Sequence, residues 1–288
     1  MYDTILLPFD GSEGAAELLH HAGEIAHWAD ATVRVLYVAD TARDSVTVVD
    51  GSTVDGLVQR GEEVVDEAAE TLETLGVPHE TDVVQGDPAP TVVEYAERYD
   101  HDLIAMPTRG REGVSRYVNG SVTEKVVRLS SVPVLTARMR PDETFAFPYE
   151  DVLVPTDGSA AAAYAAEHLV EFAAALDATV HVLSVVDDTA LGLASRSASA
   201  GEENETAAAD AVESVVSTAD AHGVDTVRHV EHGSPIEVIA DSIESNDVDA
   251  VGMGTTGRRG TDRILLGSVA EETVRSAPVP VVTVAEPE

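Results

Sequence analysis

The sequence predicts an α/β protein built from two tandem domains, each with a five-stranded parallel sheet flanked by helices. One observation is that the chain repeats itself, because Tyr2 recurs as Tyr149 (149 − 2 = 147) and the same offset aligns both halves. The other is that short apolar segments alternate with helical segments of roughly 10–15 residues, which is typical of βαβ units and a parallel sheet. The sequence therefore predicts two copies of one α/β domain.

The repeat keeps its register from end to end. Its shared pieces are Pro8 with Asp10-Gly-Ser12 (again at 155–159), Asp30-Ala-Thr-Val33 (again at 177–180), Gly86 with Pro88 (again at 233 and 235) and Val132-Pro-Val134 (again at 279–281). A unit of about 150 residues is domain-sized, whereas solenoid repeats span roughly 20–50 residues. We expect domains at 1–140 and 148–288, joined by a short connection that carries Pro141.

The elements follow from the second copy in order. Residues 151–155 are a short apolar strand, and the Asp-Gly-Ser turn at 157–159 leads into an alanine-rich helix at 160–176. An apolar strand follows at 179–186. The Ser-, Ala- and Glu-rich stretch at 188–205 is predicted to be a loop, and the amphipathic pattern at 206–222 a helix.

The second half of that copy continues the alternation. Its expected elements are a strand at 226–231, a helix at 235–246, a strand at 249–252, a glycine-bearing loop, a helix from 268 and a strand at 279–284. We expect the first copy to follow the same path.

The charge of the chain excludes several partners. Its formal net charge is −36, with 53 acidic residues against 17 basic ones, and Lys125 is its one lysine. Duplex binding depends on neutralising phosphates, so nucleic acid and anionic membranes are poor partners. Because 44% of residues are hydrophobic, disorder does not explain the acidity. An acidic, lysine-poor surface is typical of salt-in halophiles, whose molar salt mutes self-repulsion.

Composition also bounds the compartment and the chemistry. The chain has no cysteine, which excludes disulfides, thiol catalysis and cysteine-ligated zinc. No apolar run approaches the ~20 residues of a spanning helix, and no signal peptide is recognisable at Met1. We expect a cytoplasmic protein. The histidines show no set of three converging ligands, so no metal site is predicted.

A glycine pattern near the end of the second copy favours an anion site. It reads Gly254-x2-Gly257-x9-Gly267-Ser268 and precedes a predicted helix. Glycines let backbone N–H groups approach an anion, and the N–H groups and dipole of a helix N-terminus favour phosphate. No lysine follows the last glycine, so this is not a P-loop.

These features resemble the universal stress proteins, whose ATP-binding members carry G-x2-G-x9-G-[S/T]. The resemblance covers both halves and includes the Asp-Gly-Ser turn, the glycine spacing and the closing Val-Pro-Val strand. It implies two Rossmann-like domains of the adenine nucleotide alpha hydrolase-like type, with strand order 3-2-1-4-5. It also implies ATP, or AMP or ADP, as the ligand, with or without Mg²⁺, and a stress-response or regulatory role.

The resemblance further implies the role of each site residue. Pro155, Thr156 and Asp157 should border adenine and ribose, and Val185 should meet the base through its backbone. The residues expected to hold ribose and phosphates are Gly254, Gly257, Gly267, Ser268 and Val269, with Arg258 available to a triphosphate. Family members often pair domains through their last strands. We therefore expect residues 132–136 and 279–283 to form an internal pseudo-dimer, and a further homodimer stays open.

The first copy departs from the pattern. Pro107 stands in place of Gly254, and a proline has no N–H and a fixed φ. Phe9 replaces Thr156, and Asn119 replaces Leu266. The residues that remain for a weaker nucleotide site are Asp10, Val38, Gly110, Gly120, Ser121 and Val122.

Three alternatives stay open. Asp157 can serve only the start of its helix, and Ser268-x-x-Glu271 and Ser121-x-x-Glu124 fit a capping box. The protein can be an interaction protein that binds no nucleotide, with the first copy as the model. It can also be a slow ATPase or an adenylating enzyme, although no residue stands out as the positioned base such a reaction needs. No catalytic residue is therefore assigned.

Overall fold

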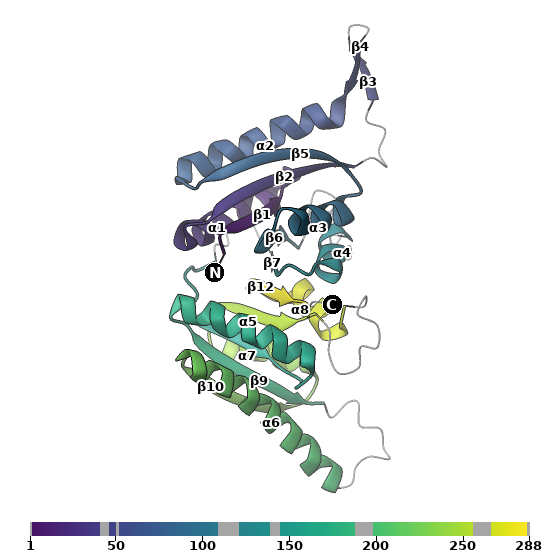
Figure 1. The fold of residues 1–288 in the computed structure, drawn as a ribbon. Helices are drawn as coiled ribbons and strands as arrows, with labels where there is room; N and C mark the ends of the chain where they lie inside the picture. Colours follow the sequence, from purple (N-terminus) through teal and green to yellow (C-terminus); the bar gives the residue numbers. More distant parts are fainter. Residues whose placement is uncertain are drawn as a thin grey trace. The chain divides into compact units, whose positions relative to one another are not determined.

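The chain consists of two compact units, residues 1–147 and 148–288. The computed structural model describes residues 2–40, 46–49, 52–108, 121–138, 145–187, 198–255 and 266–286 (Figure 1). Each unit has its own sheet and its own helices, so the site in each can be built from that unit alone.

The first unit begins with a strand and alternates strands with helices. Its elements are β1 (Thr4–Pro8), α1 (Glu13–Ala29), β2 (Thr32–Asp40), β3 (Val46–Val49), β4 (Ser52–Asp55), α2 (Gly56–Leu75), β5 (His79–Gly86), α3 (Pro88–Arg98), β6 (Leu103–Pro107), α4 (Ser121–Leu129) and β7 (Val134–Ala137).

The second unit repeats the alternation of strands and helices. Its elements are β8 (Asp151–Pro155), α5 (Ala160–Leu176), β9 (Thr179–Val186), α6 (Ala198–His222), β10 (Thr226–His232), α7 (Pro235–Ser245), β11 (Ala250–Gly254), α8 (Ser268–Ser276) and β12 (Val281–Val284).

Both sheets have the predicted topology. Within the first unit the parallel strands run in the order β5-β2-β1-β6-β7, and within the second in the order β10-β9-β8-β11-β12. Counted along each copy, this is the order 3-2-1-4-5 that the resemblance implied. Successive strands are added on one side of the first strand up to the third and on its other side from the fourth, and ligands of open α/β sheets bind at the switch point between the first and fourth strands.

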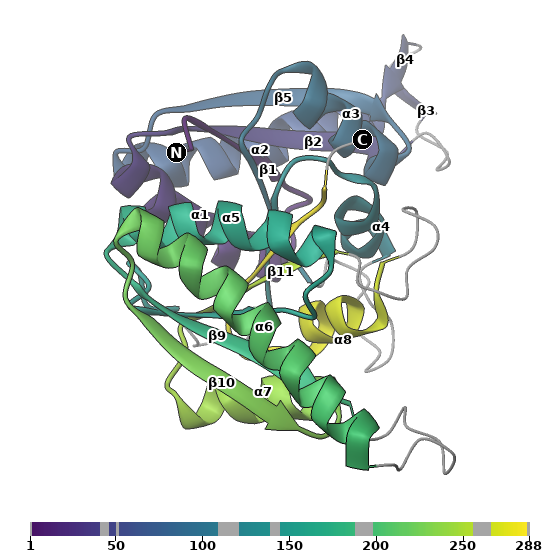
Figure 2. The same ribbon diagram turned by 60° about the horizontal axis from the view of Figure 1, so that its bottom comes forward.

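Helices cover both faces of each sheet. In the second unit α5 and α6 pack together on one face, while α7 and α8 pack together on the other. Figure 2 looks onto α5 and α6 of this unit, with β9 and β10 behind them. Because both faces are covered, the strands are apolar along most of their length, as the burial of β8, β9 and β11 shows.

The first helix of each copy is bounded by the same residue types. Ser12 and Ser159 are the N-caps of α1 and α5, and each hydroxyl accepts a hydrogen bond from a backbone N–H three residues on. Asp30 and Asp177 end these helices in the left-handed region, with φ of 55° and 58°. These shared caps explain why the helix at 160–176 begins and ends where the sequence predicted.

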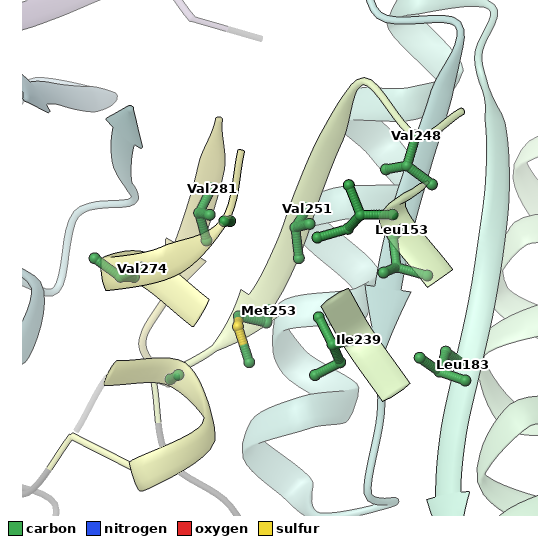
Figure 3. Packing of buried hydrophobic residues seen from close by; sticks show 11 residues of the cluster. Leu153, Leu183, Ile239, Val248, Val251, Met253, Val274 and Val281 are labelled. Atoms are coloured by element: carbon green, nitrogen blue, oxygen red, sulfur yellow. The ribbon is translucent and has the colours of Figure 1, made fainter. Parts of the chain in front are cut away.

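The core beneath α7 and α8 supports the candidate site. Leu153 of β8, Leu183 of β9 and Val251 of β11 project toward Ile239 of α7 and are buried. Figure 3 shows these side chains packed together, with Met253 at the end of β11 nearer the loop. Burying such aliphatic side chains stabilises the fold by about 1.5–3 kcal/mol each.

Two sequence predictions of secondary structure were wrong. Helix α6 begins at Ala198, so the described end of the predicted 188–205 loop is helical. Alanine and glutamate are strong helix formers, and their propensity outweighed the polar composition. The first copy also does not follow the same path, because β3 and β4 form an antiparallel hairpin there. The β-branched runs around Asp50-Gly51 are a hairpin signal that the repeat had masked.

Candidate functional site

The carboxyl ends of three neighbouring strands meet at one edge of the second sheet. Pro155 of β8 pairs with Leu183 of β9, so Val185 extends two residues beyond the end of β8. Leu153 pairs with Val251 of β11, and the same register brings Gly254 level with the residue after Pro155. The predicted residues from β8, β9 and β11 therefore lie at a common edge.

The backbone of Val185 faces the space beyond β8. The carbonyl oxygen of Leu183 accepts a hydrogen bond from Thr156 N at 2.8 Å, on the β8 side of β9. The carbonyl oxygen of Val186 accepts from Gly233 N, on the β10 side. Because backbone groups alternate sides along a strand, the N–H and carbonyl of Val185 point the same way as those of Leu183. Both groups thus point to where β8 has ended.

A tight turn joins β8 to α5. The Thr156 hydroxyl oxygen accepts a hydrogen bond from Gly158 N at 3.2 Å, and Asp157 Oδ1 accepts from Ser159 N at 3.0 Å. Gly158 has φ of 72°, which favours glycine. Thr156 is buried, whereas Asp157 is exposed. Asp157 thus has a structural role as acceptor in this turn, and Ser159 is the N-cap.

Gly254 lies against the first turn of α5. A Cβ atom added at this position would come within 3.1 Å of the carbonyl oxygen of Ala161, which is backbone and cannot easily yield. The end of β11 and the start of α5 therefore approach closely, and glycine permits that approach. This packing gives Gly254 a role that does not depend on any ligand.

Helix α8 begins next to the end of β11. Thr255 N donates to the carbonyl oxygen of Val284, and Gly267 N donates to that of Thr255 at 2.8 Å. The two ends of the intervening loop are thereby joined. This closure brings Gly267, Ser268 and Val269 to the same edge as Gly254.

The first turn of α8 has no side-chain cap. Gly267 is the N-cap, with φ of −63° and ψ of 141°, and Ser268 is the first helical residue and exposed. The capping-box interpretation of Ser268 is therefore wrong, because that interpretation needs the serine at the N-cap. Orphan N–H groups of an uncapped first turn, with the helix dipole, favour an anion.

Several predicted residues lie outside the described residues. They are Gly257, Arg258, Gly110 and Gly120, which belong to the loops after β11 and β6. The remaining predicted residues of the second unit, from Pro155 to Val269, are described and come from the β8–α5 turn, β9, β11 and the start of α8.

The first unit has the same framework with different contents. Asp10 Oδ1 accepts a hydrogen bond from Ser12 N at 2.9 Å, as Asp157 does from Ser159. Phe9 N donates to the carbonyl oxygen of Leu36, which leaves Val38 with the same backbone direction as Val185. Phe9 itself is 4% exposed, so an aromatic ring fills the place of Thr156.

The start of α4 differs from the start of α8 in one contact that sequence reasoning missed. The Thr123 hydroxyl donates a hydrogen bond of 2.8 Å to the carbonyl oxygen of Pro107, and both residues are buried. The second copy has Ala270 and Gly254 at these positions, so it lacks the bond. The substitution of Thr123 by Ala270 between the two copies is the sequence difference that could have indicated this hydrogen bond. Ser121 and Val122 open α4 beside it.

The described residues form neither a metal centre nor a membrane-spanning helix. No group of three or more His, Asp or Glu side chains among them is arranged to hold a metal ion. None of the described helices combines the length and the apolar character that crossing a bilayer requires.

Comparison with known proteins agrees with the geometry. The model of the universal stress protein family matches the chain twice, at residues 1–138 and 148–285. A universal stress protein of Methanocaldococcus jannaschii is 35% identical over 141 residues, which cover 48% of this chain and 83% of the relative. One from Methanothermobacter thermautotrophicus is 36% identical over 143 residues, covering 48% and 97%.

A solved structure matches both units together. The crystal structure of a universal stress protein from Archaeoglobus fulgidus has a TM-score of 0.75 at 26% identity and covers 99% of each chain. The family model thus matches each half of the chain once, and the structural match covers both halves. With its two repeated α/β units, the chain belongs to the universal stress protein family.

Proposed function

We propose that the second unit binds ATP or a related adenine nucleotide, AMP or ADP, and that this binding serves a stress-response or regulatory role. The observation that carries the proposal is the uncapped first turn of α8 at the edge where β8, β9 and β11 end. The glycine spacing around it is the pattern of ATP-binding members that the resemblance implied. An anionic ligand would receive N–H groups that no side chain caps.

Different residues at the carboxyl ends of β8, β9 and β11 would contact the base, the ribose and the phosphates. The N–H and carbonyl of Val185 suit a base that is recognised by hydrogen bonds at its own edge, beside Pro155 and Thr156. Asp157, exposed at the turn, suits ribose hydroxyls. Gly267, Ser268 and Val269 suit the phosphates, together with Gly254, Gly257 and Arg258. Mg²⁺ would accompany a triphosphate through phosphate oxygens rather than through a dedicated protein site.

We propose a weaker site in the first unit. It would use Asp10, Val38, Gly110, Gly120, Ser121 and Val122. Pro107 offers no N–H there, and Thr123 ties the first turn of α4 to the end of β6. The buried Phe9 ring takes the place of a threonine at the base side. Each of these differences either removes a group that could contact the nucleotide in the second unit or fills space that the nucleotide would use there.

We also propose the internal pseudo-dimer that the sequence predicts. β7 and β12 are each the terminal strand of their own unit's sheet order. Because the chain has no cysteine, Thr136→Cys with Thr283→Cys gives one unique crosslinking pair. Disulfide formation within one chain supports the pairing, and a failure to crosslink under mild oxidation counts against it.

Native mass spectrometry of protein purified without added nucleotide tests the main proposal. We expect an adenylate mass on the intact chain, or a thermal shift on adding ATP in high salt. If neither the adenylate mass nor the thermal shift is observed, the alternative of an interaction protein that binds no nucleotide is favoured. Turnover of Mg²⁺-ATP clearly above background, lost in Asp157→Ala, would instead favour an enzyme.

A backbone substitution tests the phosphate contact. Ser268→Pro removes one N–H at the first helical position, where proline is well tolerated, and Gly267 already has the extended backbone that precedes proline. Hydrogen bonds to charged groups contribute about 1.5–3 kcal/mol, so affinity should fall about tenfold to 100-fold. Ser268→Ala, which keeps the N–H, is the matched control. Equal affinity in both variants would refute the role of this N–H.

A further inference from the structure

Three side chains on neighbouring strands of the second unit form a hydrogen-bonded chain away from the candidate nucleotide edge. Asp151 opens β8, His181 lies in β9 and His229 lies in β10. His181 Nε2 is 2.9 Å from Asp151 Oδ1, and His181 Nδ1 is 3.1 Å from His229 Nε2. His181, the middle residue of these three, is 7% exposed and so is shielded from water.

The proton positions follow from the partners. An ionised carboxylate only accepts hydrogen bonds, so His181 Nε2 carries a proton and donates it to Asp151. His181 Nδ1 is then the acceptor in neutral imidazole, and His229 Nε2 must be the donor. The chain therefore runs His229 to His181 to Asp151, with one proton in each link.

The ring geometry favours a shared proton over a shared metal ion. The rings are inclined by 11°, and their centroids are 5.3 Å apart. That separation is close to the 3.1 Å N···N distance plus one ring radius on each side, so the nitrogens point at each other. A metal ion about 2.0–2.1 Å from each nitrogen would lie off this line, where neither lone pair points.

A further carboxylate lies beside the Asp151 end of the cluster, because Asp249 Oδ2 accepts hydrogen bonds from Asp151 N at 3.0 Å and Glu150 N at 2.8 Å. The buried side of α7, which packs on β9, carries Ile239, Ser242 and Ile243, and its acidic residues Glu237, Asp241 and Glu244 are exposed. Arg228 of β10 pairs with Glu213 of α6, on the opposite face of the sheet.

Burial and the neighbouring His181 lower the pKa of His229, while Glu231 acts in the opposite direction. The folded unit thus favours the neutral form of His229.

The first unit has permanent charges in the same place. At the offset of 147, Arg34 replaces His181, Asp82 replaces His229 and Thr4 replaces Asp151. Arg34 donates to Asp82 Oδ2 at 3.0 Å and pairs with Glu80, and the Tyr95 hydroxyl also donates to Asp82. An arginine stays protonated throughout the physiological range, so this cluster does not change near neutral pH.

We propose that the Asp151–His181–His229 chain is a pH-sensitive latch that holds the outer strand β10 to β9 and β8 of the second unit. At neutral pH each link has one proton. Acidification first adds one proton to the histidine pair, and whichever ring takes it, one N–H can still lie between the two rings, so both links persist. A second proton leaves one N–H of each ring facing the other, and the link to β10 breaks. Only the second unit responds.

Hydrogen–deuterium exchange of the full chain between pH 8 and pH 5 tests the latch. The readout is the opening of β10 (Thr226–His232) relative to β12 (Val281–Val284) of the same unit in the same sample, which cancels the intrinsic effect of pH. We expect the ratio to rise as pH falls. The rise should be about fivefold to tenfold, corresponding to one lost hydrogen bond. A ratio independent of pH would overturn the proposal.

Two variants and one spectroscopic measurement complete the test. His229→Gln keeps a donor to His181 but cannot be protonated, so its exchange ratio should stay constant with pH. His181→Arg with His229→Asp transfers the pair of the first unit and should behave likewise. Nitrogen-15 NMR of wild type requires no variant, and it should show His181 protonated at Nε2 and bare at Nδ1 at pH 8. The opposite tautomer would refute the chain.

Discussion

The Thr123 hydroxyl donates a 2.8 Å hydrogen bond to the carbonyl oxygen of Pro107, and the second copy has no counterpart. Ala270 and Gly254 stand at the equivalent positions, so neither the hydroxyl nor the proline ring is present there. The bond fixes the first turn of α4 to the end of β6 in the first unit. Next to the corresponding turn of α8, Gly267 N donates a hydrogen bond to the Thr255 carbonyl. The two edges therefore differ in what they leave available to a ligand.

This difference predicts how a binding site can be restored in the first unit. Pro107→Gly alone keeps the carbonyl and so keeps the Thr123 bond. Pro107→Gly with Thr123→Ala reproduces the second copy at both positions and should bind adenine nucleotide more tightly than either single variant. Isothermal titration in a Ser268→Pro background, where the second site is weakened, measures it.

The same variants have a cost in stability that serves as a check. Thr123→Ala removes a buried hydrogen bond and should lower the free energy of unfolding by about 1 kcal/mol. Two equally tight sites in the wild-type chain would contradict the predicted inequality. So would a double variant that binds no better than Pro107→Gly.

A second prediction concerns Gly252 in β11. A Cβ atom added there would lie 2.2 Å from Leu169 Cδ2, so Gly252→Ala should destabilise the second unit by about 1–3 kcal/mol. The first copy has Ala105 and Ala22 at these positions, a larger strand residue facing a smaller helix residue. Leu169→Ala should therefore recover part of the loss caused by Gly252→Ala. Chemical unfolding of the four members of this double-mutant cycle measures the coupling, and additive losses would contradict it.

Most of the fold was predictable because both copies obey local rules. Ser159 and Asp177 bound α5 at the predicted residues, since a serine N-cap and a left-handed aspartate are short-range signals. The start of α6 at Ala198 was missed because composition suggested a loop while helix propensity favoured a helix. The β3–β4 hairpin was missed because the first copy was expected to have the same elements as the second.

The helices and strands that carry the candidate residues were predictable from sequence, but the contacts between them were not. The spacing of glycines indicated the end of β11, which Gly254 occupies, and the start of α8, which Gly267 caps. Sequence could not show that a Cβ at residue 254 would meet the Ala161 carbonyl, since that depends on how closely α5 approaches β11. Nor could it show that Gly267, rather than Ser268, is the N-cap of α8.

The acidic composition predicts a stability that rises with salt. With a net charge of −36, like charges repel across the surface at low ionic strength. Raising the salt from 0.15 M to 1 M shortens the screening length from about 8 Å to about 3 Å. The melting temperature should therefore increase in sodium chloride. Sucrose at matched osmolality strengthens burial without screening charge and is the control. Equal shifts in both solutes would contradict the electrostatic explanation.

His21 predicts an acid-dependent loss of stability in the first unit. It lies in α1, is 3% exposed, and packs edge-on against Phe145 and Phe147. Burial lowers its pKa to about 4 from the ordinary 6.5, because the charged ring would lose its hydration. The folded state therefore favours the neutral ring. Its contribution is complete above pH 6.5 and is lost as pH falls toward 4, by at most about 3 kcal/mol.

The single tryptophan makes this loss measurable in the unit that contains it. Trp28 contacts Phe147 at a centroid distance of 5.8 Å, so its fluorescence follows unfolding around the same aromatic group. Urea unfolding between pH 7.5 and pH 4.5 should show a steep decline in wild type and a shallower one in His21→Phe. His20→Gln, at the exposed neighbouring position, should keep the wild-type slope. If His21→Phe declines as steeply as wild type, the acid sensitivity of this unit arises from carboxylates rather than from the buried imidazole.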